Sequence, residues 1–452
     1  MKINAKILSA TLMSSAFLSM TAVGQTTNNV VINDSIKKAY DAAKHDIDNL
    51  KKLKISGWVQ AQFQLVDSAG AATYDGGNFN ANQKDRFMIR RGRVKFTYNQ
   101  KYSQYVLQLN ATERGVNLVE IFGKVTDPWT KSISLTGGVM NRPFGFEIQQ
   151  SSADRETPER SRYVQMLLPN ERDLGAMLTY QPIKGSALYG LKVDAGMFCG
   201  NGIYVPGTTS TGTTGSTTAA GLIDSDKYKD FMAHAHYKRS FKEEKYTLGI
   251  GASTYQGGIA YQNNKVYNTL ASNAGQQYWS MADTTNGNLF KGNKAPRTYY
   301  AAELQFTMKW KLGTTTIRGE YMMGTQSGAL DKTNSPNVTT VNASNTVSRQ
   351  FNAGNVYFVQ RIGKSKHDLV LKYEWYDPNS KLSASDFGAG TTFKAAELKY
   401  TMLGVGYVLN WDENVKFMVY YNIVKNEITT GIPGYTKDLR DNVLTFRMQY
   451  RF

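Results

Sequence analysis

The sequence has little of what identifies most soluble proteins or helical membrane proteins. Its 452 residues include a single cysteine, Cys199, so no disulfide can form within the chain. Outside the N-terminus it has no run of about 18 or more apolar residues, which excludes a bundle of membrane-spanning helices. Aromatic residues at 12% and hydrophobic residues at 41% exclude a mainly disordered chain.

Positive charge is in excess, and the N-terminus has an export pattern. The chain has 53 Lys and Arg against 36 Asp and Glu, a formal charge of +17. Lys2 and Lys6 precede a mostly apolar stretch at 7–18, and Ala22-Val23-Gly24 matches a cleavage site. We expect residues 1–24 to be a signal peptide cleaved near Gly24. Because the protein is exported, we expect no nucleic-acid partner, and the charge should act on anionic surfaces or solutes.

Residues 25–53 are expected to form a separate periplasmic segment with one helix at 34–53. The apolar residues of this helix recur at spacings of four, three, four and three, in the order Ile36, Tyr40, Ala43, Ile47 and Leu50. Two heptads fit either a short coiled coil between subunits or a single stripe packed on a neighbour. Both interpretations stay open at this stage.

From residue 54 to residue 452 the apolar period changes to two, which predicts β-strands. The alternation predicts sixteen strands, at 54–65, 86–98, 103–111, 117–125, 132–140, 171–182, 187–198, 227–239, 245–256, 297–312, 314–325, 349–361, 367–377, 395–409, 415–427 and 444–452.

The connections between these strands alternate between short and long. This meander indicates an all-β fold, a transmembrane antiparallel β-barrel of 16 strands with short periplasmic turns and long outer loops. A soluble β-sandwich is the alternative, since alternation fits any half-buried sheet. Strands of about 10 to 13 residues and aromatic residues near strand ends, such as Trp310 and Trp375, favour the membrane barrel.

Three short segments carry a resemblance to a known family. They are GVMNRPFGFE at 138–147, TPER at 157–160 and RDLG at 172–175. With the arginine-rich second strand and LKYE at 371–374, the chain resembles the phosphate-selective porin O and P family. The resemblance implies a homotrimeric outer-membrane porin surrounded by lipid and lipopolysaccharide, with loop 141–170 folded into the barrel as a constriction.

The second predicted strand concentrates basic residues on one face. Arg91, Arg93 and Lys95 share that face, and each cation facing lipid would cost roughly 2–4 kcal/mol near the midplane. We therefore expect them to line the lumen. Arg90 has the opposite parity, and we expect it near the outer rim or at a subunit contact.

Loop 141–170 adds charges of both signs to the expected pore. The candidate anion-binding cations are Arg142, Arg155, Arg160 and Arg162, and the candidate constriction acids are Asp154, Glu156 and Glu159. The family resemblance implies pore-lining roles for Arg91, Arg93, Arg142 and Arg160. Mixed charges create a transverse field across a constriction, or they fasten the loop to the wall as salt bridges; the sequence leaves both open.

The expected function is passive diffusion of small solutes, with selectivity for phosphate-like anions held by arginine forks. The alternative is a general diffusion porin for neutral or mixed small solutes. We expect no enzyme activity, since the motifs of hydrolases, metalloproteases and nucleotide-binding proteins are missing from the sequence. We also expect no cofactor and no metal, because His234 and His236 share a strand face without a visible third ligand.

Overall fold

The computed structural model describes residues 28–200, 224, 226–261, 263–273, 275–282, 290–334, 345–388 and 391–452. The expected signal peptide and its cleavage site near Gly24 lie outside these residues. The chain divides into two compact units, one ending at Leu53 and the other running from Lys54 to Phe452. Among the described residues, no helix is long and apolar enough to cross a membrane.

The first unit contains the helix that the apolar spacing predicts. Helix α2 (Asn28–Lys52) has 25 residues, and it begins earlier than predicted. The residues Ile36, Tyr40, Ile47 and Leu50 of the apolar stripe are all exposed. Association of three copies through this stripe stays a prediction.

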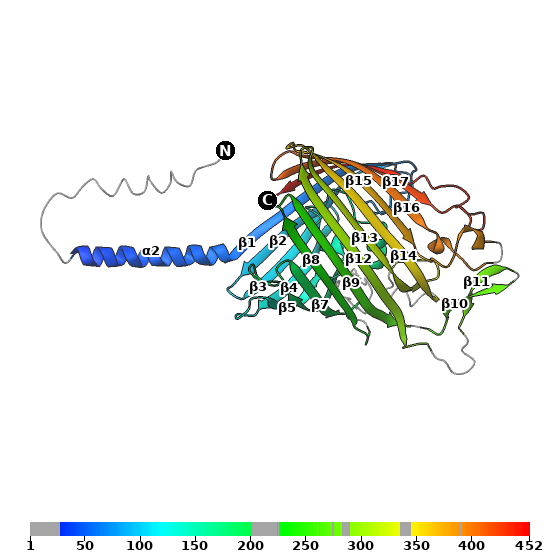
Figure 1. The fold of residues 1–452 in the computed structure, drawn as a ribbon, viewed down its shortest axis with the longest axis horizontal. Coiled ribbons are helices and arrows are strands. Elements are labelled where there is room, and N and C mark those ends of the chain that lie inside the picture. Colours follow the sequence, from blue (N-terminus) through cyan, green and yellow to red (C-terminus); the bar gives the residue numbers. More distant parts are fainter. Residues whose placement is uncertain are drawn as a thin grey trace, which may run out of the picture. The chain divides into compact units, whose positions relative to one another are not determined.

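The second unit is a closed antiparallel β-barrel (Figure 1). The ring closes where β1 pairs with β18, from Trp58 opposite Arg451 to Val66 opposite Val443. Sixteen strands form the ring, which confirms the predicted strand number: β1 (Leu53–Val66), β2 (Asp85–Asn99), β3 (Ser103–Thr112), β4 (Gly115–Thr126), β5 (Ile133–Asn141), β6 (Arg172–Tyr180), β7 (Leu191–Phe198), β8 (Asp230–Phe241), β9 (Tyr246–Ala260), β12 (Lys294–Trp310), β13 (Gly313–Ala329), β14 (Thr346–Ile362), β15 (His367–Asp377), β16 (Tyr400–Asn410), β17 (Val415–Asn426) and β18 (Val443–Arg451).

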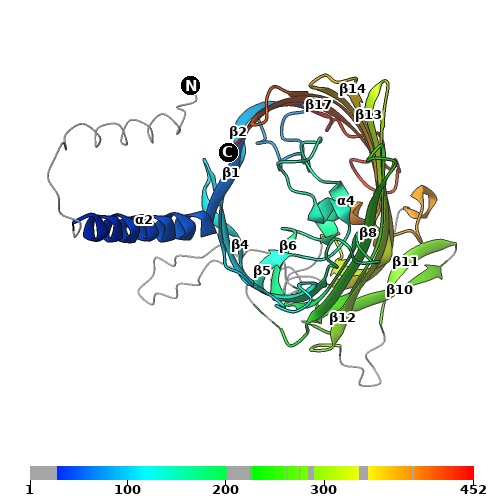
Figure 2. The ribbon, with the colours of Figure 1, turned by 60° about the vertical axis from the view of Figure 1, so that its left-hand side comes forward.

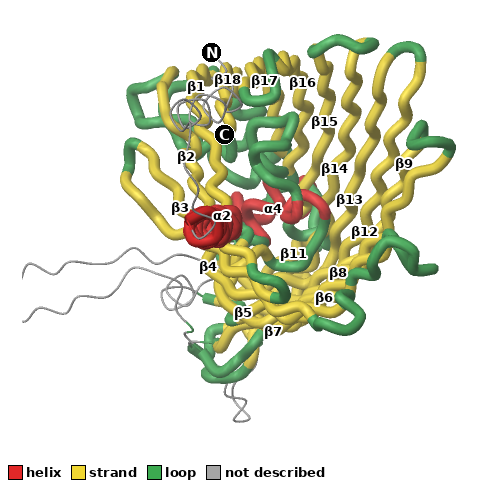
Figure 3. The backbone as a smooth tube through the Cα atoms, turned by 90° about the vertical axis from the view of Figure 1, so that its left-hand side faces the viewer, coloured by secondary structure: helices red, strands yellow, loops and turns green. Residues whose placement is uncertain are grey.

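The barrel has an apolar outside and a polar inside. In β15, Leu369, Leu371 and Tyr373 are exposed on the outer face, whereas Lys372 and Glu374 are buried on the inner face. A soluble sheet would place these two sets the other way round, because water would cover the charges. This inversion is the pattern of a transmembrane barrel, and it excludes the soluble sandwich. Figure 3 shows neighbouring strands of the barrel, β12 to β16, running side by side.

Two connecting regions differ from the predicted pattern. Strands β10 (Val266–Asn273) and β11 (Gln276–Met281) form a hairpin within the long connection from β9 to β12, which was expected to be a loop. The predicted strand at 395–409 starts later, at Tyr400, because Ala395–Glu397 forms a 3-10 turn, η2. That turn buries Glu397 against Arg349 of β14, at 2.7 Å from Nη2. A second 3-10 turn, η1, spans Ala384–Asp386.

The connection from β5 to β6 lies inside the ring of strands, as Figure 2 shows for its helix α4. We call residues 142–171 the inner loop. It contains two short helices, α3 (Phe146–Gln149) and α4 (Arg162–Leu167). Apolar residues of the inner loop pack on the barrel wall and form the largest buried cluster of the second unit, with Phe144, Ile148, Tyr163 and Leu167 against Tyr255, Tyr299 and Phe351.

Candidate functional site

The inner loop enters the barrel through a turn that requires glycine. Gly145 has φ 56°, and its backbone N–H donates to Ser253 Oγ at 2.9 Å. A Cβ atom at this position would lie 2.2 Å from Glu320 Oε2, which instead accepts the N–H of Phe146 at 2.8 Å. Phe144 is fully buried between the rings of Tyr255 and Tyr299. The Pro-Phe-Gly sequence of the motif thus fixes where the chain turns inward.

Three buried carboxylates attach the inner loop to strands β13, β14 and β15. We call Glu147, Glu320 and Glu374 the carboxylate anchor. Glu147 accepts hydrogen bonds from the backbone N–H and the hydroxyl of Ser161, both at 2.9 Å.

The rest of the carboxylate anchor is also paired. Glu147 accepts a hydrogen bond from Tyr357 and lies 3.4 Å from Lys372 Nζ. Glu374 accepts the N–H of Arg162 at 2.8 Å and pairs with Lys372 at 2.6 Å. Glu320 also accepts from the hydroxyl of Tyr163 at 3.0 Å. Each of the three carboxylates of the anchor therefore has hydrogen-bond or ion-pair partners.

The opposite side of the inner loop meets arginines of strands β2 and β18. Glu159 lies 2.7 Å from both Arg90 and Arg91 and 3.0 Å from Arg447. Burial alone would raise the pKa of the Glu159 carboxyl, but these guanidinium groups outweigh burial and hold its pKa well below the usual range. The carboxylate is therefore ionised at any physiological pH.

Two further arginines have guanidinium nitrogens without a hydrogen-bond partner among the described residues. Arg155 is 2% exposed, and none of its three guanidinium nitrogens has a hydrogen-bond partner among the described residues. Burial lowers the pKa of Arg155 to about 10, with further lowering by the nearby Arg160, so it stays cationic at neutral pH. Arg93 is half-buried, and its Nε and Nη1 likewise lack partners in the described part of the chain. We call Arg90, Arg91, Arg93, Arg155 and Arg447 the arginine cluster.

A line of alternating charges continues from the arginine cluster along the wall. Arg160 pairs with Glu171, Glu171 with Arg172, and Arg172 with Glu120 at 3.0 Å. Lys95 ends the line at 3.2 Å from Glu120. The cations around Glu171, Arg160 first among them, overcome burial and lower its pKa to about 2. Arg160 and Lys95 are thus placed on the inside of the barrel, but both are paired.

Three more of the predicted site residues also have hydrogen-bond or ion-pair partners. Arg142 is fully buried, donates to the carbonyl of Pro169 at 3.1 Å and lies 3.8 Å from Asp173. Asp154 pairs with Arg451 at 2.8 Å, and Glu156 pairs with Arg318 at 2.5 Å. All three candidate acids therefore bond to arginines of the wall, which favours their role as fasteners of the loop.

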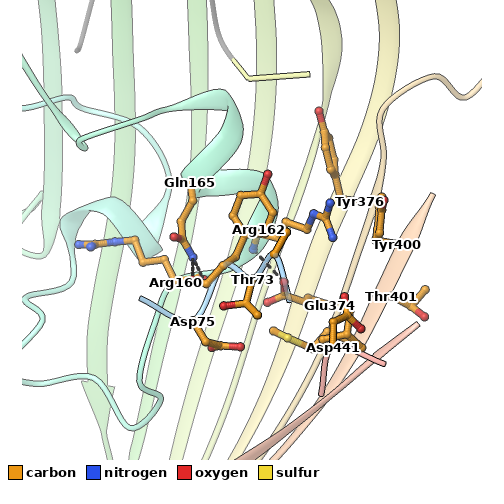
Figure 4. A pocket seen from close by; sticks show the side chains of 14 residues that line it. Thr73, Asp75, Arg160, Arg162, Gln165, Glu374, Tyr376, Tyr400, Thr401 and Asp441 are labelled. Atoms are coloured by element: carbon orange, nitrogen blue, oxygen red, sulfur yellow. Dashed lines mark hydrogen bonds between the residues drawn. The ribbon is translucent and has the colours of Figure 1, made fainter. Parts of the chain in front are cut away.

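Arg162 lies in an aromatic pocket of about 480 Å³ (Figure 4). Its guanidinium carbon lies 3.3 Å from the ring centre of Tyr400 and 4.5 Å from that of Tyr74. Asp75 and Asp441 line the same pocket. Stacking on two rings holds the start of α4 against strand β16 and the β1–β2 loop.

The expectation that Arg90 lies at the outer rim or at a subunit contact is wrong. Arg90 and its neighbour Arg91 both reach Glu159 inside the barrel. Successive side chains of a regular strand point to opposite faces, so β2 departs from regular alternation at this step. In keeping with that shift, Met88 also faces inward, where Gln62 Nε2 lies 3.1 Å from its sulfur.

Sequence reasoning missed several residues that complete these clusters. Glu147 and Arg172 are part of the quoted motif segments, and Arg447 has inward parity in the last strand, so each carried a signal. None was singled out, because their partners lie far away in the sequence. Tyr357, which donates to Glu147, is 210 residues distant.

The fold is shared with solved outer-membrane proteins. An anion-selective porin from Comamonas acidovorans matches 88% of this chain and 99% of its own length, with a TM-score of 0.50 and 10% identity. OmpF of Salmonella typhi, solved in complex with daunomycin, matches 88% and 97%, with a TM-score of 0.51 and 12% identity. The chain therefore has the fold of outer-membrane porins.

No protein-family model and no protein of curated function matches the sequence. The likeness to the phosphate-selective porin O and P family thus rests on the motif residues alone.

Proposed function

We propose that this protein is an outer-membrane diffusion pore for small solutes that favours anions, phosphate-like anions among them. The observation that carries the proposal is the arginine cluster, in which four guanidinium groups surround the carboxylate of Glu159 and Arg93 lies further along β2, near Glu120 and Glu171. Among the described residues, guanidinium nitrogens of Arg93 and Arg155 have no hydrogen-bond partner, and the planar fork of a guanidinium suits phosphate and carboxylate oxygens. The name of the Comamonas protein, an anion-selective porin, is consistent with this proposal.

The proposed pore has its short turns in the periplasm and its long loops outside the cell, and it works as a homotrimer in lipid and lipopolysaccharide. An anion entering the lumen meets the excess positive charge of the arginine cluster beside the inner loop. Weak, successive contacts allow both entry and exit. The second candidate, a general diffusion pore, is favoured by the many paired charges of the lumen, such as Arg318 with Glu156.

Replacing Arg93 and Arg155 together with Gln tests the proposal. Neither arginine forms an ion pair among the described residues, so the change removes attraction for anions without breaking a pair seen in that part of the chain. We expect the anion-over-cation permeability ratio, measured from reversal potentials in a KCl gradient, to fall several-fold. The effect should shrink as salt rises from about 0.01 M to 1 M, because the Debye length contracts from about 30 Å to about 3 Å. Phosphate should also lose any block of chloride current.

The matched control replaces Arg114 and Arg239 with Gln, which removes the same charge from two exposed positions. This control should keep the wild-type ratio. A wild-type pore without ion selectivity would instead establish the general diffusion pore. An unchanged ratio in the R93Q/R155Q variant would remove the arginine cluster from the permeation path.

A further inference from the structure

A second cluster of titratable groups faces the lumen away from the arginine cluster. His234 and His236 lie on β8, and Glu303 lies on β12. Glu303 Oε1 is 3.5 Å from His234 Nε2 and 3.7 Å from His236 Nε2. One carboxylate oxygen therefore faces two imidazoles.

The strand between them makes this approach possible. Gly251 of β9 stands opposite His236 on one side and opposite Glu303 on the other. A Cβ atom at Gly251 would lie 2.8 Å from Glu303 Oε1, and one at Gly249 would lie 3.0 Å from His236 Nε2. Two glycines thus leave the space in which the three side chains meet.

The atoms that face one another in this cluster make no hydrogen bond within the described residues. Neither Nε2 atom and neither oxygen of Glu303 has a hydrogen-bond partner in the described part of the chain. His234 and Glu303 are buried, whereas His236 is half-buried and reaches a pocket of about 540 Å³. Gln149 and Gln150 of the inner loop line the same pocket, so the cluster borders the space between wall and loop.

Most charged groups around the cluster are already paired. Lys192 lies 2.6 Å from Asp194 on β7, and Arg318 of β13 lies 2.5 Å from Glu156 of the inner loop. Lys238 of β8 is exposed and cationic, and Glu320 of β13 is held by Phe146 and Tyr163. Strand β9 contributes Ser253 and glycines at this level, which do not titrate.

We propose that His234 and His236 form a proton-dependent cationic station of the pore, which adds positive charge to the lumen only in acid. With both imidazoles neutral, the cluster has the charge of Glu303, −1. The first proton brings the cluster to zero and the second brings it to +1. Anion selectivity should therefore rise as the medium becomes acidic, which goes beyond the proposed function.

The chemistry of the three side chains supports this step. Histidine is the side chain whose ordinary pKa, about 6.5, places its charge change between pH 5 and 8. A protonated imidazole carries a donor on both nitrogens, so each Nε2–H would face the unpartnered Oε1 of Glu303. A movement of a few tenths of an ångström brings the present separations to hydrogen-bond length.

Reversal potentials in a KCl gradient between pH 8 and pH 5 test the proposal. We expect the anion-over-cation permeability ratio of the wild-type pore to rise several-fold toward pH 5. The H234Q/H236Q variant should lose this rise while keeping the wild-type ratio at pH 8. The H367Q variant is the matched control, because His367 lies at the turn end of β15 beside Tyr407, and it should keep the full rise.

Two further variants keep the proposal testable if the double histidine variant does not fold. E303Q should increase the ratio at pH 8, because it removes the negative charge, and it should keep a rise toward pH 5. If the double histidine variant forms no channels, H236Q alone should lose about half of the rise.

The proposal is overturned if the wild-type ratio is constant with pH, or if the double variant retains the rise. The two proposals can be told apart. A pore without selectivity at pH 8 would contradict the proposed anion pore, and a histidine-dependent rise toward pH 5 would still support the cationic station.

Discussion

The two sides of the inner loop meet the barrel wall by different chemistry. On one side, the carboxylate anchor joins the loop to β13, β14 and β15: the wall carboxylates Glu320 and Glu374 accept N–H groups of the loop, and Glu147 of the loop binds groups of β14 and β15. On the other side, the loop supplies the carboxylate of Glu159, and the wall supplies arginines of β2 and β18. On the first side each carboxylate has its partners, whereas on the second side, within the described part of the chain, Arg93 and Arg155 have guanidinium nitrogens without a hydrogen-bond partner.

The two sides of the inner loop therefore differ in what their charged groups do: one side holds the loop in place and the other selects among solutes. A buried polar group that has its partners stabilises one geometry, because breaking it leaves an unpaired group without water. A buried cation that lacks a partner is unfavourable for folding and attracts an anion instead. The carboxylate anchor therefore fixes the position of the inner loop, and the arginine cluster uses that position to act on solutes.

Glu147→Ala should give the largest effect on stability. It removes the acceptor of Ser161 and Tyr357 and leaves Lys372, which is 1% exposed, with Glu374 as its remaining close carboxylate. Breaking a buried pair costs about 3–5 kcal/mol. The strand pairing is untouched, so the barrel should persist with a released inner loop. We expect a lower unfolding midpoint in lipid vesicles and a larger, noisier single-channel current.

The exposed acid Glu113 provides the control, and Glu113→Ala should behave as wild type. A quiet current of wild-type size from Glu147→Ala would show that this side does not hold the loop.

Glu159→Gln tests the arginine cluster separately from the carboxylate anchor, because it should increase anion selectivity. It removes the carboxylate that Arg90, Arg91 and Arg447 share, so the anion-over-cation ratio should rise several-fold at low salt. Stability should fall by about 1–3 kcal/mol, less than for Glu147→Ala, because Gln keeps an oxygen that accepts from the guanidinium groups and Arg90 is only half-buried. Reversal potentials and unfolding in vesicles measure the two effects. Asp154→Asn, at an exposed pair with Arg451, should change neither by a comparable amount.

The sequence predicts the strands and the direction of their side chains better than it predicts the contacts between the inner loop and the wall. Period-two alternation predicted the sixteen strands and the inward direction of Arg91 and Lys95, because each follows from the pleat of a single strand. The pairing of the inner loop's charges depends on where that loop lies, and its partners are hundreds of residues away. Parity also failed at Arg90, where β2 departs from regular alternation.

Asp75→Asn should give the smallest effect on stability. It tests whether water reaches the space between the carboxylate anchor and the arginine cluster. Burial raises the pKa of Asp75 to about 7, with further raising by Glu159 and Glu374, one from each side, and lowering by the hydrogen bond from Asn422 at 2.6 Å. Because this pKa lies above the unfolded value of about 3.9, Asp75 adds stability as pH falls through 7.

An Asn at position 75 removes this titration while keeping an oxygen to accept from Asn422. The variant should unfold at a higher denaturant concentration than wild type at pH 8, and the difference should shrink toward pH 6. One proton changes the unfolding free energy by at most about 1.4 kcal/mol per pH unit, which bounds the effect between pH 8 and pH 7. Unfolding midpoints in vesicles at both pH values measure it. A difference that does not depend on pH would show that water reaches Asp75, and that the two sides of the inner loop do not enclose a common dry interior.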